Sequence, residues 1–112
     1  MLPQINRLKK KKDFENVFKD GKGFKEDLLY LKIKKNNLDY SRIGFIVGKN
    51  FSKKAVERNK IKRRLREIIK ERIPDLKKGL DIIIVVMPKS RNDFQELRET
   101  INRLFIKAKL DD

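Results

Sequence analysis

The 112-residue sequence predicts one α+β domain over residues 1–112, a sandwich in which helices cover a small mixed sheet. Apolar residues recur every three or four positions in three segments, which is typical of amphipathic helices. Three other segments alternate apolar and polar residues or are continuously apolar, as strands are. No linker and no internal repeat interrupts the chain. The predicted order is helix, strand, strand, helix, strand, helix, with room for a further strand split from one of the long β regions.

The first helix is predicted in KDFENVFKDG, where Phe14, Val17 and Phe18 form one apolar stripe. Asp13 lies in its first turn, and Gly21 is placed to end it. We interpret the tripeptide GKG that begins there as a turn, because it is too short to form a phosphate-binding loop.

Two strands are predicted next. In DLLYLKIKK, Leu29, Leu31 and Ile33 alternate with Tyr30 and two lysines, which indicates a half-buried strand. The segment RIGFIVG is apolar on both faces. A glycine within a strand, here Gly44, often marks a close approach of another backbone or of a ligand.

The second helix is predicted in AVERNKIKRRLREIIKE. Ser52 is placed to cap this helix, its first turn covers residues 53–56, and Pro74 ends it. The apolar stripe of the helix consists of Ile61, Leu65, Ile68, Ile69 and Ile73.

The segment GLDIIIVVMP predicts a central strand that is covered on both faces and stopped by Pro88. Asp93 and Glu96 have the spacing of a capping box that starts the last helix. The apolar stripe of that helix consists of Phe94, Leu97, Ile101, Leu104, Phe105 and Ala108.

The composition indicates a polyanionic partner. The formal net charge is +15, which suits nucleic acid and, less well, an anionic membrane surface. The chain has no Cys and no His, which excludes disulfides, thiol nucleophiles and His acid–base chemistry. No apolar run could cross a bilayer, and no signal-peptide core follows the basic start. We therefore expect a cytoplasmic protein without a membrane partner.

The second predicted helix is crowded with cations. Like charges four residues apart repel by about 0.2–0.5 kcal/mol per pair, so the run weakens the helix unless an anion lies against it. A solvated face would explain the glutamates among the cations but not the net excess, which favours contact with nucleic acid. The basic residues of this segment are Arg58, Lys60, Lys62, Arg63, Arg64, Arg66 and Lys70.

The carboxylates show no pairing that would indicate catalysis or metal binding, so no catalytic or metal-ligating residue is predicted. Phe14, Phe18 and Tyr30 lie near basic residues. Such aromatics either stack on bases, as in single-strand binders, or pack a helix on a sheet. The residues alone favour packing for the two phenylalanines.

These patterns together resemble the protein subunit of bacterial ribonuclease P. That family spaces basic residues around an Arg-Asn-Arg core, and the segments NRLKK, DFENVF, DGK and RIGFIVGK of this chain match the family as well. The resemblance covers nearly the whole chain. The residues to which it assigns RNA binding are Lys54, Arg58, Asn59, Lys60, Lys62, Arg63 and Arg66.

The resemblance implies a ribosomal protein S5 domain 2-like fold: about three helices, a mostly antiparallel four-stranded sheet and a left-handed β-α-β crossover, where general rules favour a right-handed one. It implies that the chain joins the ribonuclease P catalytic RNA, and that this holoenzyme, an endoribonuclease, removes the 5′ leader from precursor tRNA. The RNA and its bound Mg²⁺ would perform the hydrolysis. A cleft at Phe14, Phe18 and Tyr30 would hold the leader, and no DNA partner is expected.

The chain departs from the family pattern in three places. Lys60 stands where the family has Arg, which keeps the charge and loses the bidentate fork. Asn50 replaces a second Lys, and the segment after it is one residue longer. The aromatic of the first family strand aligns with Tyr30 or with Leu31. The alternatives are a structural RNA-binding protein of similar fold, with no role in processing, and a DNA-binding module.

Overall fold

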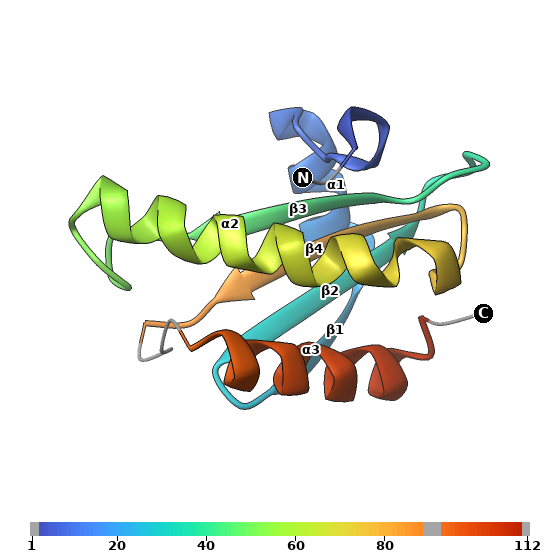
Figure 1. Ribbon diagram of the computed structural model, residues 1–112. Helices are drawn as coiled ribbons and strands as arrows, with labels where there is room; N and C mark the ends of the chain where they lie inside the picture. The colour runs from blue at the N-terminus through green and yellow to red at the C-terminus, as the bar shows by residue number, and fades with distance from the viewer. Residues whose placement is uncertain (1–2, 89–92, 111–112) are drawn as a thin grey trace.

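The computed structural model describes residues 3–88 and 93–110, which form helices on both faces of one sheet (Figure 1). The helices are α1 (Lys11–Asp20), α2 (Ala55–Arg72) and α3 (Phe94–Ala108), with 3-10 turns η1 (Gln4–Asn6) and η2 (Ile73–Asp75). The strands are β1 (Lys22–Glu26), β2 (Leu29–Lys35), β3 (Arg42–Val47) and β4 (Leu80–Val86). The predicted α+β sandwich is confirmed.

The sheet is mixed, with the strand order β1-β2-β4-β3. β1 and β2 pair antiparallel, as do β2 and β4, whereas β3 and β4 are parallel. The continuously apolar β4 therefore lies inside the sheet, as its sequence predicts. In Figure 1, β3 and β4 both run from right to left, β4 lies below β3 and α2 lies in front of the sheet. This arrangement makes the β3-α2-β4 crossover left-handed.

The main core lies between the sheet and the pair α2 and α3, which cover the same face (Figure 1). The predicted stripes of both helices point into it: Leu65 and Ile69 of α2 and Ile101 and Leu104 of α3 are completely buried. Asp93 caps α3 as predicted, because its side chain accepts a hydrogen bond of 3.0 Å from the Glu96 amide.

α1 lies on the opposite face of the sheet, behind β3 in Figure 1. Val17 of α1 is completely buried against Leu8 and Ile83. Gly21 ends the helix, and no side chain would fit there, because a Cβ would lie 2.5 Å from the Val17 oxygen and 2.6 Å from the Ile33 oxygen. Its φ is −81°, so the close approach of these backbones accounts for the glycine, and not a left-handed helix cap.

The fourth strand is β1, and its position corrects two sequence predictions. The extra strand is not split from a long β region, and residues 22 and 23 of the tripeptide GKG belong to a strand. β1 is short and polar, with only Phe24 packed against the main core. Its strand conformation comes from pairing with β2, as in the register of Phe24 with Leu31. Local pattern does not report such pairing.

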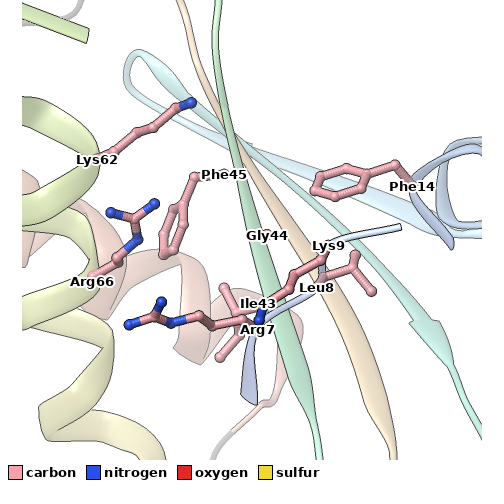
Figure 2. Close-up of a pocket in the computed structure, with 9 residues that line it drawn as sticks. All are labelled: Arg7, Leu8, Lys9, Phe14, Ile43, Gly44, Phe45, Lys62 and Arg66. Atoms are coloured by element: carbon pink, nitrogen blue, oxygen red, sulfur yellow. The ribbon is translucent and has the colours of Figure 1, made fainter. Parts of the chain in front are cut away.

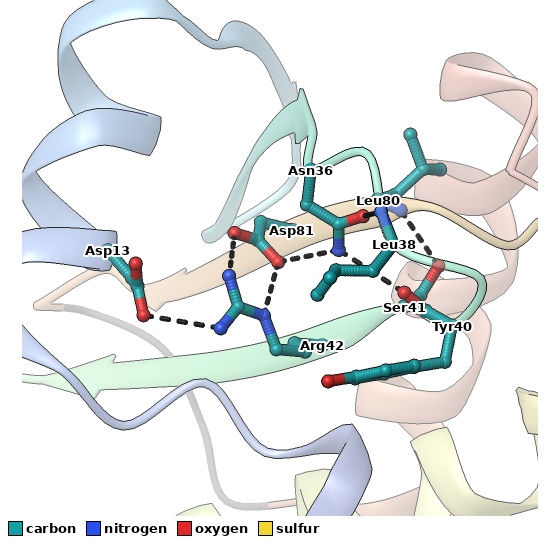
Figure 3. Close-up of polar contacts among 8 residues, drawn as sticks. All are labelled: Asp13, Asn36, Leu38, Tyr40, Ser41, Arg42, Leu80 and Asp81. Carbon is teal, nitrogen blue, oxygen red and sulfur yellow. Dashed lines mark hydrogen bonds and ion pairs between the residues drawn. The ribbon is translucent and has the colours of Figure 1, made fainter.

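A polar network joins α1, β3, β4 and the β2–β3 turn (Figure 3). The Arg42 guanidinium donates to both carboxylate oxygens of Asp81, at 2.8 and 2.7 Å, and to Asp13 of α1 at 3.3 Å. Asn36 also donates to Asp81, at 2.9 Å. Asp81 is only 6% exposed, so its charge depends on these partners. The pKa of Arg42 is raised, mainly by its hydrogen bond to Asp81, while burial opposes the shift.

Candidate nucleic-acid interface

α2 carries its cations in two groups. Arg58, Lys62 and Arg66 follow one another at four-residue intervals, so they share one flank of the helix, where they are half-buried. The remaining motif residues are exposed to solvent. These exposed residues are Lys54, Asn59, Lys60 and Arg63.

The start of α2 differs from the prediction. The helix begins at Ala55 with Lys54 as its N-cap residue, and no side chain caps it. Ser52 stands too early to cap: its hydroxyl accepts from the Lys54 amide at 3.2 Å and donates to Glu57. Arg58 donates to the Ser52 carbonyl oxygen at 2.8 Å, so this motif residue also fixes the loop before the helix.

A cavity of about 200 Å³ lies between the N-terminal segment, β3 and α2 (Figure 2). The N-terminal segment follows the free edge of β3, where the Leu8 amide donates to the Ile43 oxygen at 2.9 Å. This pairing places Arg7 opposite Arg66, although the two residues are far apart in sequence. The lining residues are Arg7, Leu8, Lys9, Phe14, Ile43, Gly44, Phe45, Lys62 and Arg66.

The charged groups around this cavity are positive. Within the described part of the chain, every charged residue that lines it is a cation. Burial lowers the pKa of Arg66, and the like charges of Arg7 and Arg63 lower it further. The cavity is therefore a place where an anion would be electrostatically favourable.

The aromatic surface, which we define as Phe14, Phe18 and Tyr30, lies on the α1 face of the sheet. The Phe14 ring covers Gly44 so closely that a Cβ there would lie 2.4 Å from the ring. The Phe14 ring therefore occupies the space that a side chain at position 44 would need. The sequence predicts instead that another backbone or a ligand comes close to Gly44. Phe18 is 38% exposed, and Lys32 lies over its ring, 5.6 Å from the centroid.

Tyr30 and Leu31 point to opposite faces. Tyr30 pairs with Val85, which packs beside α1, whereas Leu31 is fully buried in the main core. Tyr30 is half-buried, and its hydroxyl would lie 2.0 Å from a Cβ at Gly23. The ring therefore extends across β1, and the aromatic that shares the α1 face is Tyr30.

Sequence reasoning missed four contributors to these surfaces. Arg7 and Phe45 line the cavity, and Ile46 and Val85 are half-buried beside α1. The alternation of β3 could have separated Phe45 from Ile46, since neighbours in a strand face opposite sides. No sequence signal indicates that Arg7 meets α2, because the contact depends on a backbone pairing at the edge of the sheet.

Two classes of site are not found in residues 3–88 and 93–110. No cluster of three or more Asp, Glu, His or Cys side chains there could hold a metal ion. Among the same residues, no helix is long and apolar enough to cross a membrane.

The mixed sheet with a cation-rich helix in a left-handed crossover defines a class of small basic α+β proteins. A family model described as Ribonuclease P matches residues 2–109 of this chain. The chain belongs to the family of ribonuclease P protein components, whose role is in tRNA processing.

Individual relatives agree with this assignment. The chain is 40% identical to the ribonuclease P protein component of a Pseudanabaena species, over 98% of this chain and 97% of the relative. It is similar in structure to the Staphylococcus aureus RNase P protein, with a TM-score of 0.87 and 27% identity over 96% and 98% of the two chains. Against the Thermotoga maritima RNase P protein the TM-score is 0.78, with 38% identity over 88% and 94%.

Proposed function

We propose that this chain is the protein subunit of a ribonucleoprotein that removes the 5′ leader from precursor tRNA. In this proposal α2 lies against the catalytic RNA, and the aromatic surface beside α1 binds the leader strand. The catalytic RNA and its bound Mg²⁺ carry out the hydrolysis. The family implies the partner RNA, and the arrangement of cations and aromatics on two faces of one sheet supports a division between two RNA strands.

One observation carries the proposal: the basic motif and the aromatic surface lie on opposite sides of β3. The motif flank of α2 lies on the side of Phe45, and the Phe14 ring lies on the other side (Figure 2). The protein can therefore contact two strands at once.

Reconstitution tests this function directly. The chain is mixed with a bacterial ribonuclease P RNA and labelled precursor tRNA at low Mg²⁺, and 5′ cleavage is compared with that of the RNA alone. We expect faster cleavage with the protein and none by the protein without RNA. Binding to the RNA without any gain in cleavage would favour the alternative, a structural RNA-binding protein of similar fold.

Arg63 is the cleanest probe of the motif, because it is exposed, whereas Arg58 also holds the loop before α2. We expect Arg63→Ala to reduce the slope of log K against log salt for RNA binding by about 0.7–0.9, the value of one lost phosphate contact. The unfolding midpoint should hardly change. An unchanged slope would mean that the Arg63 side chain is only solvated.

A further inference from the structure

The cavity at the edge of β3 combines two kinds of wall (Figure 2). Arg7, Lys62 and Arg66 supply guanidinium and ammonium groups, and the Phe45 ring extends between β3 and α2 beside them. Leu8 and Ile43 add aliphatic carbon to the lining. A solvated cationic surface would need no apolar wall, and an apolar cavity would not gather cations, so the combination indicates a ligand with both a charged and a flat apolar part.

The cations converge here at an electrostatic cost. Arg66 is half-buried, and its pKa is lowered by burial, by Arg7 and by Arg63. Lys9, the fourth cation of the lining, donates to Gln4, a neutral partner. A bound anion would offset both the burial of Arg66 and the mutual repulsion of the guanidinium groups.

We propose that this cavity binds one nucleotide of an RNA strand, with its phosphate between Lys62, Arg66 and Arg7 and its base against the Phe45 ring. Arg binds phosphate oxygens in pairs, and aromatic rings accept any base by stacking. The cavity of about 200 Å³ is too small for a duplex. This inference rests on the proposed function and adds a discrete nucleotide site to it.

The location gives the site a particular role. The lining includes Phe14 and Gly44, which belong to the α1 side of β3, as well as Lys62 and Arg66 of α2. A nucleotide held here would lie between the motif helix and the aromatic surface. We assign it to the catalytic RNA, since its phosphate contacts come from the motif helix.

Titration calorimetry with short ligands tests the site. The ligands are a 5′-phosphorylated RNA dinucleotide whose internal linkage is an uncharged methylphosphonate, the same dinucleotide without the 5′ phosphate, and inorganic phosphate. We expect the phosphorylated dinucleotide to bind at least about tenfold more tightly than either of the others. Only this ligand has both a charged phosphate for the cations and a base for the Phe45 ring. Binding of inorganic phosphate as tight as that of the dinucleotide would reduce the site to a simple anion site and overturn the proposal.

Four variants locate the binding. Lys62→Gln and Arg66→Gln should each weaken the binding of the phosphorylated dinucleotide about tenfold. Phe45→Leu should weaken the binding of both dinucleotides by a similar factor, and it should leave the affinity for inorganic phosphate unchanged. Lys70→Gln is the matched control, because it removes an exposed cation of the same helix outside the cavity. Equal losses for Lys70→Gln and Arg66→Gln would show that only the overall charge matters and would overturn the proposal.

The source of the nucleotide is tested with the assembled complex. If the catalytic RNA fills the site, adding that RNA should abolish dinucleotide binding. If the dinucleotide still binds to the complex, the RNA assignment is wrong. A failure of this site is distinguishable from a failure of the proposed function, since reconstituted 5′ cleavage would then persist in the Phe45→Leu variant.

Discussion

Replacing Arg42 with Ala is expected to lower the free energy of unfolding by roughly 3 kcal/mol, the lower end of the range for breaking a buried ion pair. The substitution would remove two hydrogen bonds of 2.8 and 2.7 Å from Asp81, whose side chain is only 9% exposed. Asn36 would remain as the partner of a nearly buried carboxylate. The lower end applies because the Arg42 side chain is 23% exposed, so water can enter the vacated space.

Denaturant unfolding measures this loss, and two variants serve as controls. Lys34→Ala breaks the ion pair with Asp20, which also joins α1 to the sheet but is exposed, and should cost less than about 1 kcal/mol. Arg42→Lys keeps the charge without the bidentate fork and should fall between the two. If Arg42→Ala lowered the free energy of unfolding no more than Lys34→Ala does, the network in Figure 3 would contribute no more to stability than an exposed ion pair.

The Arg42 network also bears on the aromatic surface. Asp13 accepts from Arg42 at 3.3 Å and directly precedes Phe14 in α1. The guanidinium thus connects the first turn of that helix to β4, one of the two inner strands of the sheet. A weakened network would allow α1 to shift over the sheet, so the position of the aromatics depends on a polar contact as well as on the burial of Val17.

Elements with a strong local pattern could be predicted from the sequence. The stripes of α2 and α3 and the apolar run of β4 specify their burial directly, because each pattern has the period of its element. β1 could not be predicted, since its polar residues adopt a strand only by pairing with β2. Ser52 predicts a start for α2 that is two residues too early, because it lies in the loop before the helix and its hydroxyl accepts from the Lys54 amide of that loop.

The candidate site could be predicted only in part, for a related reason. The cations of α2 all lie within one short segment of the sequence, so their clustering is evident. Arg7 and Phe45 reach the same cavity through the pairing of the N-terminal segment with β3, and Arg42 meets Asp81 across 39 residues. Such contacts are set by the topology of the sheet, which no local pattern contains.

Helical spacing places Phe14 and Phe18 on one stripe, yet the structure gives them different surroundings. Phe14 is half-buried over Gly44 and packs with Leu8 and Val17. Phe18, at 38% exposure, retains an accessible ring with Lys32 above it. A substitution at Phe14 will therefore change stability as well as any binding, and Phe18 is the better probe of a leader contact.

Phe18→Leu is expected to weaken the binding of precursor tRNA to the reconstituted holoenzyme about tenfold to a hundredfold, because a stacked base contributes about 1–3 kcal/mol. Leucine retains most of the apolar volume but offers no flat ring, so the unfolding midpoint should change little. Mature tRNA has no 5′ leader, and its affinity should stay the same. The measurement is the ratio of the two dissociation constants for the same enzyme preparation.

Phe24→Leu is the matched control for this ratio. It makes the same chemical change in β1, but Phe24 packs against the main core on the opposite face from α1. Any effect of Phe24→Leu should follow stability and should change both tRNA affinities equally. If Phe18→Leu also changed both affinities equally, or left both unchanged, Phe18 would have no contact with the leader. A selective loss at Phe18 alone would place the leader strand beside α1, because only a ligand that reaches this face can distinguish the two phenylalanines.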